Sequence, residues 1–206
     1  MSSPERHTSI VPPDAGGPVG MVKATLFLHL RAFVIREFGE RGWAGLLEAL
    51  RPADRKVLEG LVLVGGWEPV GVWNRTLEAF LTSNYSDPAN NMARLAKFIA
   101  DRDLNTFFRL VLKVGSPDFI LSRTASLYNR YFDAGTFVPQ KIAHQHWVAT
   151  LTVPRHEDQG PGLLSCDAGI SAWLVHALEL SGVRPTVTHP KCRFNRSMYC
   201  QYDLTW

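Results

Sequence analysis

Cysteine is scarce in this sequence, and no disulfide is needed to stabilise the fold. Three cysteines occur among 206 residues, and a chain of this length buries enough apolar surface to form a core without disulfides. The first 20 residues contain no apolar run typical of a secretory signal, so we expect a reducing cytoplasm. An odd number of cysteines in that compartment favours free thiols or metal ligands over disulfides.

Other absences exclude whole classes of function. No apolar run approaches the roughly 18 residues that a membrane span needs. The 22 basic and 19 acidic residues give a net charge of +3 and are scattered along the chain, which does not favour a nucleic-acid interface. Phosphate-binding, dinucleotide-binding, nucleophile-elbow and HExxH motifs are missing. We therefore expect neither a membrane span nor nucleic-acid binding.

Apolar residues at helical spacing dominate the chain up to residue 132. Residues 1–20 are rich in proline and glycine without periodicity, and are expected to form a disordered leader. From residue 21 onward, segments with apolar residues at intervals of three and four are separated by glycine or proline. The expected helices cover about 22–38, 43–50, 52–60, 73–84, 86–103, 104–114 and 116–132. The stretch LVLVGGW, residues 61–67, does not decide between strand and helix end.

The period changes after residue 133. GTFVPQKIAHQHWVATLTVP is strand-like and β-branched, and SMYCQYDLTW alternates apolar and polar residues. Between them, a helix is expected from about Pro161 to Gly182, followed by a strand over 183–189. The predicted fold class is α+β. We expect one domain over 21–206, with a mainly helical portion over 21–132 and a C-terminal antiparallel β-β-α-β-β unit over 133–206.

All three cysteines lie in this C-terminal unit, together with His189. Cys166 lies near the start of the expected helix, and His189 ends the strand that follows. From Cys166 the helix rises about 22 Å, and the strand spans about 20 Å, so a strand that doubles back returns His189 to the level of Cys166. Cys192 follows in the next turn, and Cys200 shares the apolar face of the last strand. We therefore expect these four side chains to converge.

Spacing alone leaves two interpretations of this group open. Three thiolates and one imidazole form a closed, tetrahedral set of soft ligands, which favours structural zinc over catalysis. Alternatively, Cys166 and Cys200 are ordinary small buried side chains, while His189 and Cys192 lie in a surface turn. H-x-x-C followed by seven residues and a cysteine is not one of the standard zinc spacings.

The C-terminal residues resemble a known family. SLYNRYFDAGTFV and SCDAGISAWLVHALELSGVRPTVTHPKCRFNRSMYCQYDLTW look like the helices and closing strands of the 4-vinyl reductase domain. That domain is related in fold to the TRAPP transport-complex subunits and to the haem-nitric-oxide-binding domains. The resemblance covers residues 120–206 and extends loosely to the N-terminal helices, whose layout is similar to that of a group of myxobacterial paralogues.

The resemblance implies two sites. Sensor domains of that family hold zinc by Cys, Glu, Cys and Cys at the same intervals, which implies structural zinc on Cys166, His189, Cys192 and Cys200, with histidine replacing the glutamate. Domains of the family also commonly hold a small apolar molecule or acyl chain between helices and sheet. Aromatic side chains that could line this space are Phe107, Phe108, Phe119, Tyr128, Phe132, Trp147 and Trp173. Aromatic residues at such spacing are more often core.

Haem and catalysis are both disfavoured by the sequence. The Tyr-x-Ser-x-Arg motif by which haem-nitric-oxide-binding domains grip the haem propionates is absent, and His29, His144 and His146 are expected to be ordinary half-buried side chains. The segment HEDQGPG could supply an acid-base cluster with two of these histidines, but it is more simply a polar loop. We expect no enzyme activity.

Two hypotheses about function follow. The first is a non-enzymatic sensor or regulatory module that binds a small molecule or an acyl chain, contains structural zinc and acts through a protein partner. The second is a scaffold or adaptor subunit with a closed core, which dimerises or binds a partner through its helical face without a small ligand. The volume of any internal cavity distinguishes them.

Overall fold

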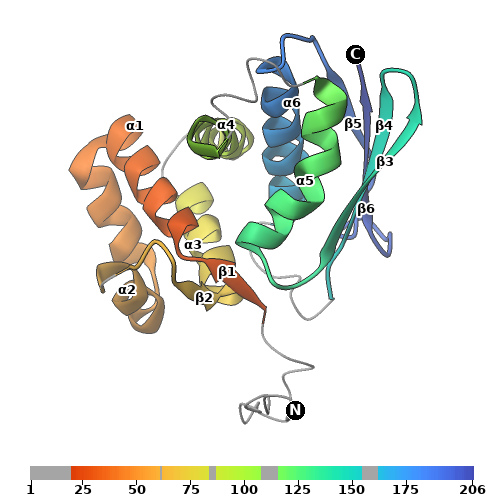
Figure 1. Ribbon diagram of the computed structural model, residues 1–206. Helices are drawn as coiled ribbons and strands as arrows, with labels where there is room; N and C mark the ends of the chain where they lie inside the picture. The colour runs from red at the N-terminus through yellow and green to blue at the C-terminus, as the bar shows by residue number, and fades with distance from the viewer. Residues whose placement is uncertain (1–19, 61, 84–86, 108–115, 155–161) are drawn as a thin grey trace, which may run out of the picture.

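The computed structural model describes residues 20–60, 62–83, 87–107, 116–154 and 162–206, so the predicted leader lies almost wholly outside the described residues. The first part of the described chain is a group of helices with a short two-stranded antiparallel sheet (Figure 1). These elements are β1 (Met21–Lys23), α1 (Thr25–Ala49), α2 (Pro52–Glu59), β2 (Trp67–Pro69), α3 (Val70–Thr82) and α4 (Pro88–Phe107).

Glycine and proline set the boundaries of these helices. Helix α1 is interrupted at Gly39, whose φ of 72° is readily available only to glycine, and this break separates the two helices expected before residue 50. Helix α2 starts with Pro52 in its first turn, as expected, and Gly60 follows its last residue. The two short strands were not predicted: LVLVGGW left strand and helix end open, and only its last residue, Trp67, lies in β2. Three-residue strands carry no readable alternation.

Helix α5 (Pro117–Tyr131) leads from the helical part into the sheet. The Ser116 side chain accepts a hydrogen bond from the backbone N–H of Phe119 at 3.3 Å, and Pro117 fits the first turn, where no N–H partner is needed. The helix expected over 104–114 falls partly in α4, and its residues from 108 lie outside the described residues.

A four-stranded antiparallel sheet follows. Its strands are β3 (Thr136–Ala143), β4 (His146–Thr152), β5 (Thr186–Lys191) and β6 (Cys200–Thr205), in the order β3-β4-β6-β5. Strand β6 buries Cys200, Tyr202 and Leu204 completely, as its alternation predicted. The strand expected over 183–189 instead starts at Thr186 and ends at Lys191.

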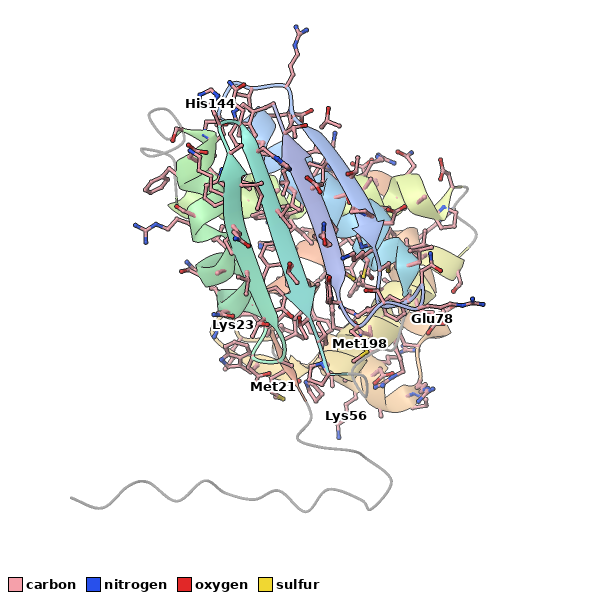
Figure 2. The ribbon with its side chains drawn as sticks, turned by 90° about the vertical axis from the view of Figure 1, so that its right-hand side faces the viewer. Met21, Lys23, Lys56, Glu78, His144 and Met198 are labelled. Atoms are coloured by element: carbon pink, nitrogen blue, oxygen red, sulfur yellow. The ribbon has the colours of Figure 1, made fainter. Side chains whose placement is uncertain are left out.

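Helices cover one face of this sheet only. Between β4 and β5 the chain forms a π-helical turn, η2 (Ser165–Ile170), that continues into α6 (Ser171–Glu179). Helices α5 and α6 lie on the same face (Figure 1), and no described helix crosses the opposite face (Figure 2). Helix α4 packs against α6 and η2, and thereby joins the helical part to the sheet. The α+β class is confirmed, and no described helix combines the length and apolarity of a membrane span.

Candidate functional site

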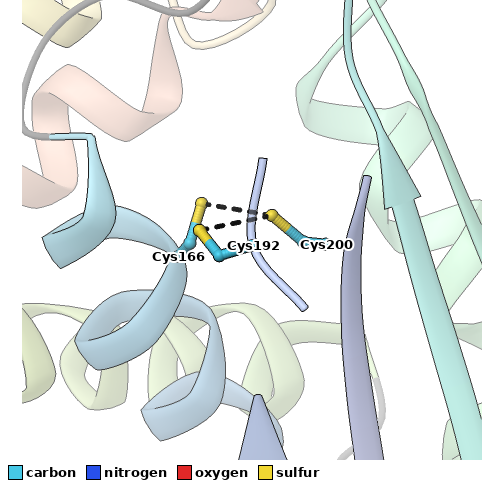
Figure 3. A group of neighbouring side chains, drawn as sticks. All are labelled: Cys166, Cys192 and Cys200. Carbon is cyan, nitrogen blue, oxygen red and sulfur yellow. Dashed lines mark hydrogen bonds between the residues drawn. The ribbon is translucent and has the colours of Figure 1, made fainter. Parts of the chain in front are cut away.

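The three cysteines form one buried cluster (Figure 3). Cys166 lies in η2, Cys192 follows β5 and Cys200 begins β6. The Sγ atom of Cys200 lies 3.6 Å from that of Cys166 and 4.0 Å from that of Cys192, and all three sulfurs lie within 4.8 Å of one another. All three are free thiols and at most 5% exposed. The chain therefore brings three soft donor atoms together without a disulfide.

His189 lies beside this cluster but outside the group of atoms within 4.8 Å. Its ring stacks on Tyr202 with centroids 4.6 Å apart, and its side chain is 3% exposed. Its Nδ1 atom lies 3.3 Å from Oδ1 of Asp167, next to Cys166 in sequence. The imidazole is thus held against the sulfurs by a stacked ring and a carboxylate.

The three thiols of the cluster differ in their pKa values. A hydrogen bond shared with Cys166, the backbone N–H of Arg193 at 3.5 Å, and His189 lower the pKa of Cys200 to about 4. The same hydrogen bond and burial raise the pKa of Cys166, and burial raises that of Cys192. The surroundings therefore favour ionisation of Cys200 over ionisation of Cys166 or Cys192.

A cavity of about 240 Å³ adjoins the cluster, between the helical part and the sheet. Its walls come from α1, α3, α4, α5, β3, β4, η2 and α6, and are mostly aliphatic and aromatic. Cys166 of the cluster lines the cavity, and so does Arg193, which interacts with Cys200. Gly169 in η2 matters here, because a Cβ atom at this position would lie 2.6 Å from Cε of Met92 on α4.

Only some of the residues that were predicted to line a pocket lie in the wall of this cavity. Tyr128, Phe132 and Trp173 line the cavity, whereas Phe119 and Trp147 do not. Trp147 is 7% exposed in the core between sheet and α5, where its Nε1–H donates to Asp118 at 2.7 Å. The side chains of Phe107 and Phe108 lie outside the described residues.

Several wall residues were missed by the sequence analysis. Helices α3 and α4 contribute Val70, Trp73, Asn74, Leu77, Met92, Ala96 and Ile99. Their spacing is that of any buried helix face, so the sequence offers no signal that separates cavity wall from packed core. Arg193 was missed as well, although its place beside Cys192 was a signal.

Comparisons with known proteins define the fold. No protein-family model and no curated relative matches the sequence. Among solved structures, the chain has the fold of H-NOX proteins. An H-NOX protein from Shewanella oneidensis in the Fe(II)NO ligation state is 13% identical, with 88% of this chain and 97% of that chain covered and a TM-score of 0.68. The Fe(II) unliganded H-NOX protein from K. algicida is 12% identical, with 89% and 95% covered and a TM-score of 0.65.

These comparisons correct two predictions. The assignment to the 4-vinyl reductase domain is wrong, because the similar structures are H-NOX proteins. The fold relation to haem-nitric-oxide-binding domains is what remains of that resemblance. The prediction of structural zinc is contradicted as well, since the metal named for these structures is Fe(II) and three neighbouring thiols alone are not evidence for zinc.

The described wall lacks the histidine that holds haem iron in globins and peroxidases. Haem iron is held by histidine, cysteine thiolate, methionine or tyrosine, and no histidine lines the described cavity. The Tyr128 hydroxyl donates to the Ala134 carbonyl at 2.7 Å, and the pKa of Cys166 is raised, which disfavours its thiolate. The cavity, about 240 Å³, is also below the roughly 300–1,000 Å³ typical of larger ligand pockets.

Proposed function

We propose that this chain is a non-enzymatic binding domain of H-NOX fold whose central cavity holds a small apolar molecule in place of haem. The observation that carries this proposal is the cavity of about 240 Å³ with mostly apolar walls. A dry apolar cavity of roughly 150 Å³ is sufficient to bind benzene. A volume of this size therefore favours a ligand-holding core over a closed one.

The position of the cavity supports a sensing role. One ligand would touch α3 and α4 on one side, and η2, α6 and the sheet on the other. A ligand that prefers one arrangement of these elements shifts the population toward it. We propose that a protein partner binds one of these conformations preferentially at the surface.

Binding is favoured over catalysis by the composition of the wall. No described wall residue is an aspartate, glutamate or histidine, so the usual general acids and bases are missing from it. Of the histidines considered for an acid-base cluster, His146 instead pairs with Asp203 at 2.6 Å on the sheet, and His144 is exposed at the turn between β3 and β4 (Figure 2). His156 lies outside the described residues.

The experiment compares thermal unfolding with and without 1-octanol, a neutral apolar probe. At a probe concentration of about 100 times Kd, binding stabilises the folded state by roughly 2.7 kcal/mol. Ala96→Leu fills the cavity from α4 and is expected to remove the shift. Ala53→Leu, on the exposed surface of α2, is the matched control and should retain it.

A shift that is absent in the unaltered protein, or equal in all three proteins, contradicts the proposal. Absence of any shift, with Ala96→Leu less stable than the unaltered chain, would favour the scaffold hypothesis, because an added leucine side chain overpacks a closed core.

A further inference from the structure

Arg193 is the one charged side chain among the described residues that line the cavity. Its guanidinium carbon lies 4.8 Å from the centroid of the Phe194 ring. Its Nε and Nη1 atoms are shielded from solvent. A cation held on an aromatic face at the wall of an apolar space is fixed in place and weakly hydrated.

Two of the other polar wall groups already donate to backbone carbonyls. Oγ1 of Thr124 donates to the Leu121 carbonyl at 2.7 Å, and the Tyr128 hydroxyl donates to the Ala134 carbonyl. The described wall contains no carboxylate that would compete for Arg193. A positive charge at an apolar wall favours an anionic group on a bound molecule.

Cys200 is another neighbour of Arg193, and the electrostatic interaction between them lowers the pKa of the Cys200 thiol. A guanidinium has five N–H donors in a planar fork. One edge can therefore face a sulfur while another binds a carboxylate through two parallel hydrogen bonds.

The volume limits the apolar part of the ligand. Scaling from a cavity of roughly 150 Å³ that holds benzene, about 240 Å³ accommodates about ten non-hydrogen atoms. We propose that the ligand class is a small hydrophobic monocarboxylic acid, medium-chain or aryl-substituted, whose carboxylate binds Arg193 and whose apolar body fills the cavity. This inference rests on the proposed function of the same cavity.

Isothermal titration calorimetry of the full chain with octanoate, 1-octanol and acetate tests it. Octanoate and 1-octanol share the alkyl chain and differ in charge, whereas acetate has the charge without the chain. Charge-assisted hydrogen bonds predict roughly tenfold to a hundredfold tighter binding of octanoate than of 1-octanol, and no binding of acetate. Arg193→Gln should make the two affinities equal, while Arg184→Gln, at an exposed position outside the wall, should retain the preference.

The outcomes separate this inference from the proposed function. If 1-octanol binds the unaltered protein as tightly as octanoate, or if Arg193→Gln keeps the preference, the carboxylate inference is overturned and the apolar cavity stands. If neither octanoate nor 1-octanol binds, the proposed function fails as well. The comparison of the two ligands on the unaltered protein needs no variant, so it decides even where Arg193→Gln does not fold.

Discussion

Cys200 is the residue on which the chemistry of the site depends. It begins β6, is fully buried, and has hydrogen-bonding contacts to Cys166, to the backbone of Arg193 and to His189. The lengths of a helix and a strand were sufficient to predict that distant cysteines come close. They could not predict what the cluster holds, because protonation and ligand choice depend on burial and neighbours that no spacing encodes.

The depressed pKa of Cys200 predicts a specific dependence of stability on pH. The pKa falls from the 9.0 of an unperturbed thiol to about 4 in the folded chain. Between these values the unfolded state carries the extra proton, so this contribution to stability is fully present above about 9 and is lost as the pH falls toward 4.

Chemical denaturation of the unaltered protein and Cys200→Ala measures this effect. The difference between their free energies of unfolding should be larger at about pH 8 than at about pH 5. A difference that is constant or shrinks with rising pH would show that Cys200 is not ionised in the folded state.

Gly135 is a second residue with a definite prediction. Its φ is 82°, and an added Cβ would lie 2.5 Å from the Thr152 carbonyl oxygen. Gly135→Ala should therefore reduce the free energy of unfolding by at least about 1–3 kcal/mol. Gly45→Ala in α1, where no atom lies within 4 Å of the added carbon, should raise it by roughly 0.5–1 kcal/mol. Equal effects in urea unfolding would contradict the strain argument.

Among the elements, a part-buried ion pair joins α2 to α3. Asp54 accepts hydrogen bonds from Nε and Nη2 of Arg75 at 2.7 and 2.6 Å, and its side chain is 4% exposed. The hydrogen bond from Arg75 keeps the pKa of Asp54 below its usual 3.8. The resulting stabilisation is present above that value and is lost as the pH falls below it.

Asp54→Asn should destabilise the protein by roughly 1–3 kcal/mol at neutral pH, because Arg75 then lacks its charged partner. The deficit should shrink below about pH 4, where the unaltered carboxylate is also protonated. Urea unfolding at both pH values measures it, and Glu78→Gln on the exposed face of α3 is the control. A deficit that persists unchanged in acid would contradict the role of the carboxylate charge.

The sequence largely predicted which segments form helices and which form strands. It did not predict the irregular turn within the last helical segment. The breaks at Gly39 and Pro52 and the alternation of β6 were predicted, since backbone geometry and burial period are local properties. The π-helical turn around Cys166 was not predicted, and its packing against α4 is visible only in the tertiary structure. Close approach at Gly169 and Met92 is a tertiary contact with no local sequence signal.

At the scale of the molecule, the cavity is a product of how the helical part meets the sheet. Its wall contains residues from segments between Leu26 and Arg193, so no single sequence motif predicts the cavity. The sequence predicted an apolar space between helices and sheet through a resemblance to the wrong family. It named Tyr128, Phe132 and Trp173 in the wall, but could not tell them from Trp147, which packs in the core.

The mismatch between the H-NOX fold and the cavity wall predicts that the purified chain does not bind haem stoichiometrically. Titration of haem into the protein should leave the Soret band as it is for free haem, because no described wall residue is a histidine. A sharp, shifted Soret band at one haem per chain would contradict this prediction. Loss of that band in Cys166→Ser or Tyr131→Phe would then identify the iron ligand.

The central claim is that one cavity between the two parts of the fold holds a small apolar molecule. Its most direct test is nuclear magnetic resonance of the tryptophan indole N–H groups during titration with 1-octanol. Trp73 on α3 and Trp173 on α6 both line the cavity, whereas Trp147 lies in the sheet core and Trp67 is 38% exposed on β2. The account predicts saturable shifts of the Trp73 and Trp173 signals with a single Kd. Shifts confined to Trp67, or no saturable shift at either cavity residue, would contradict it.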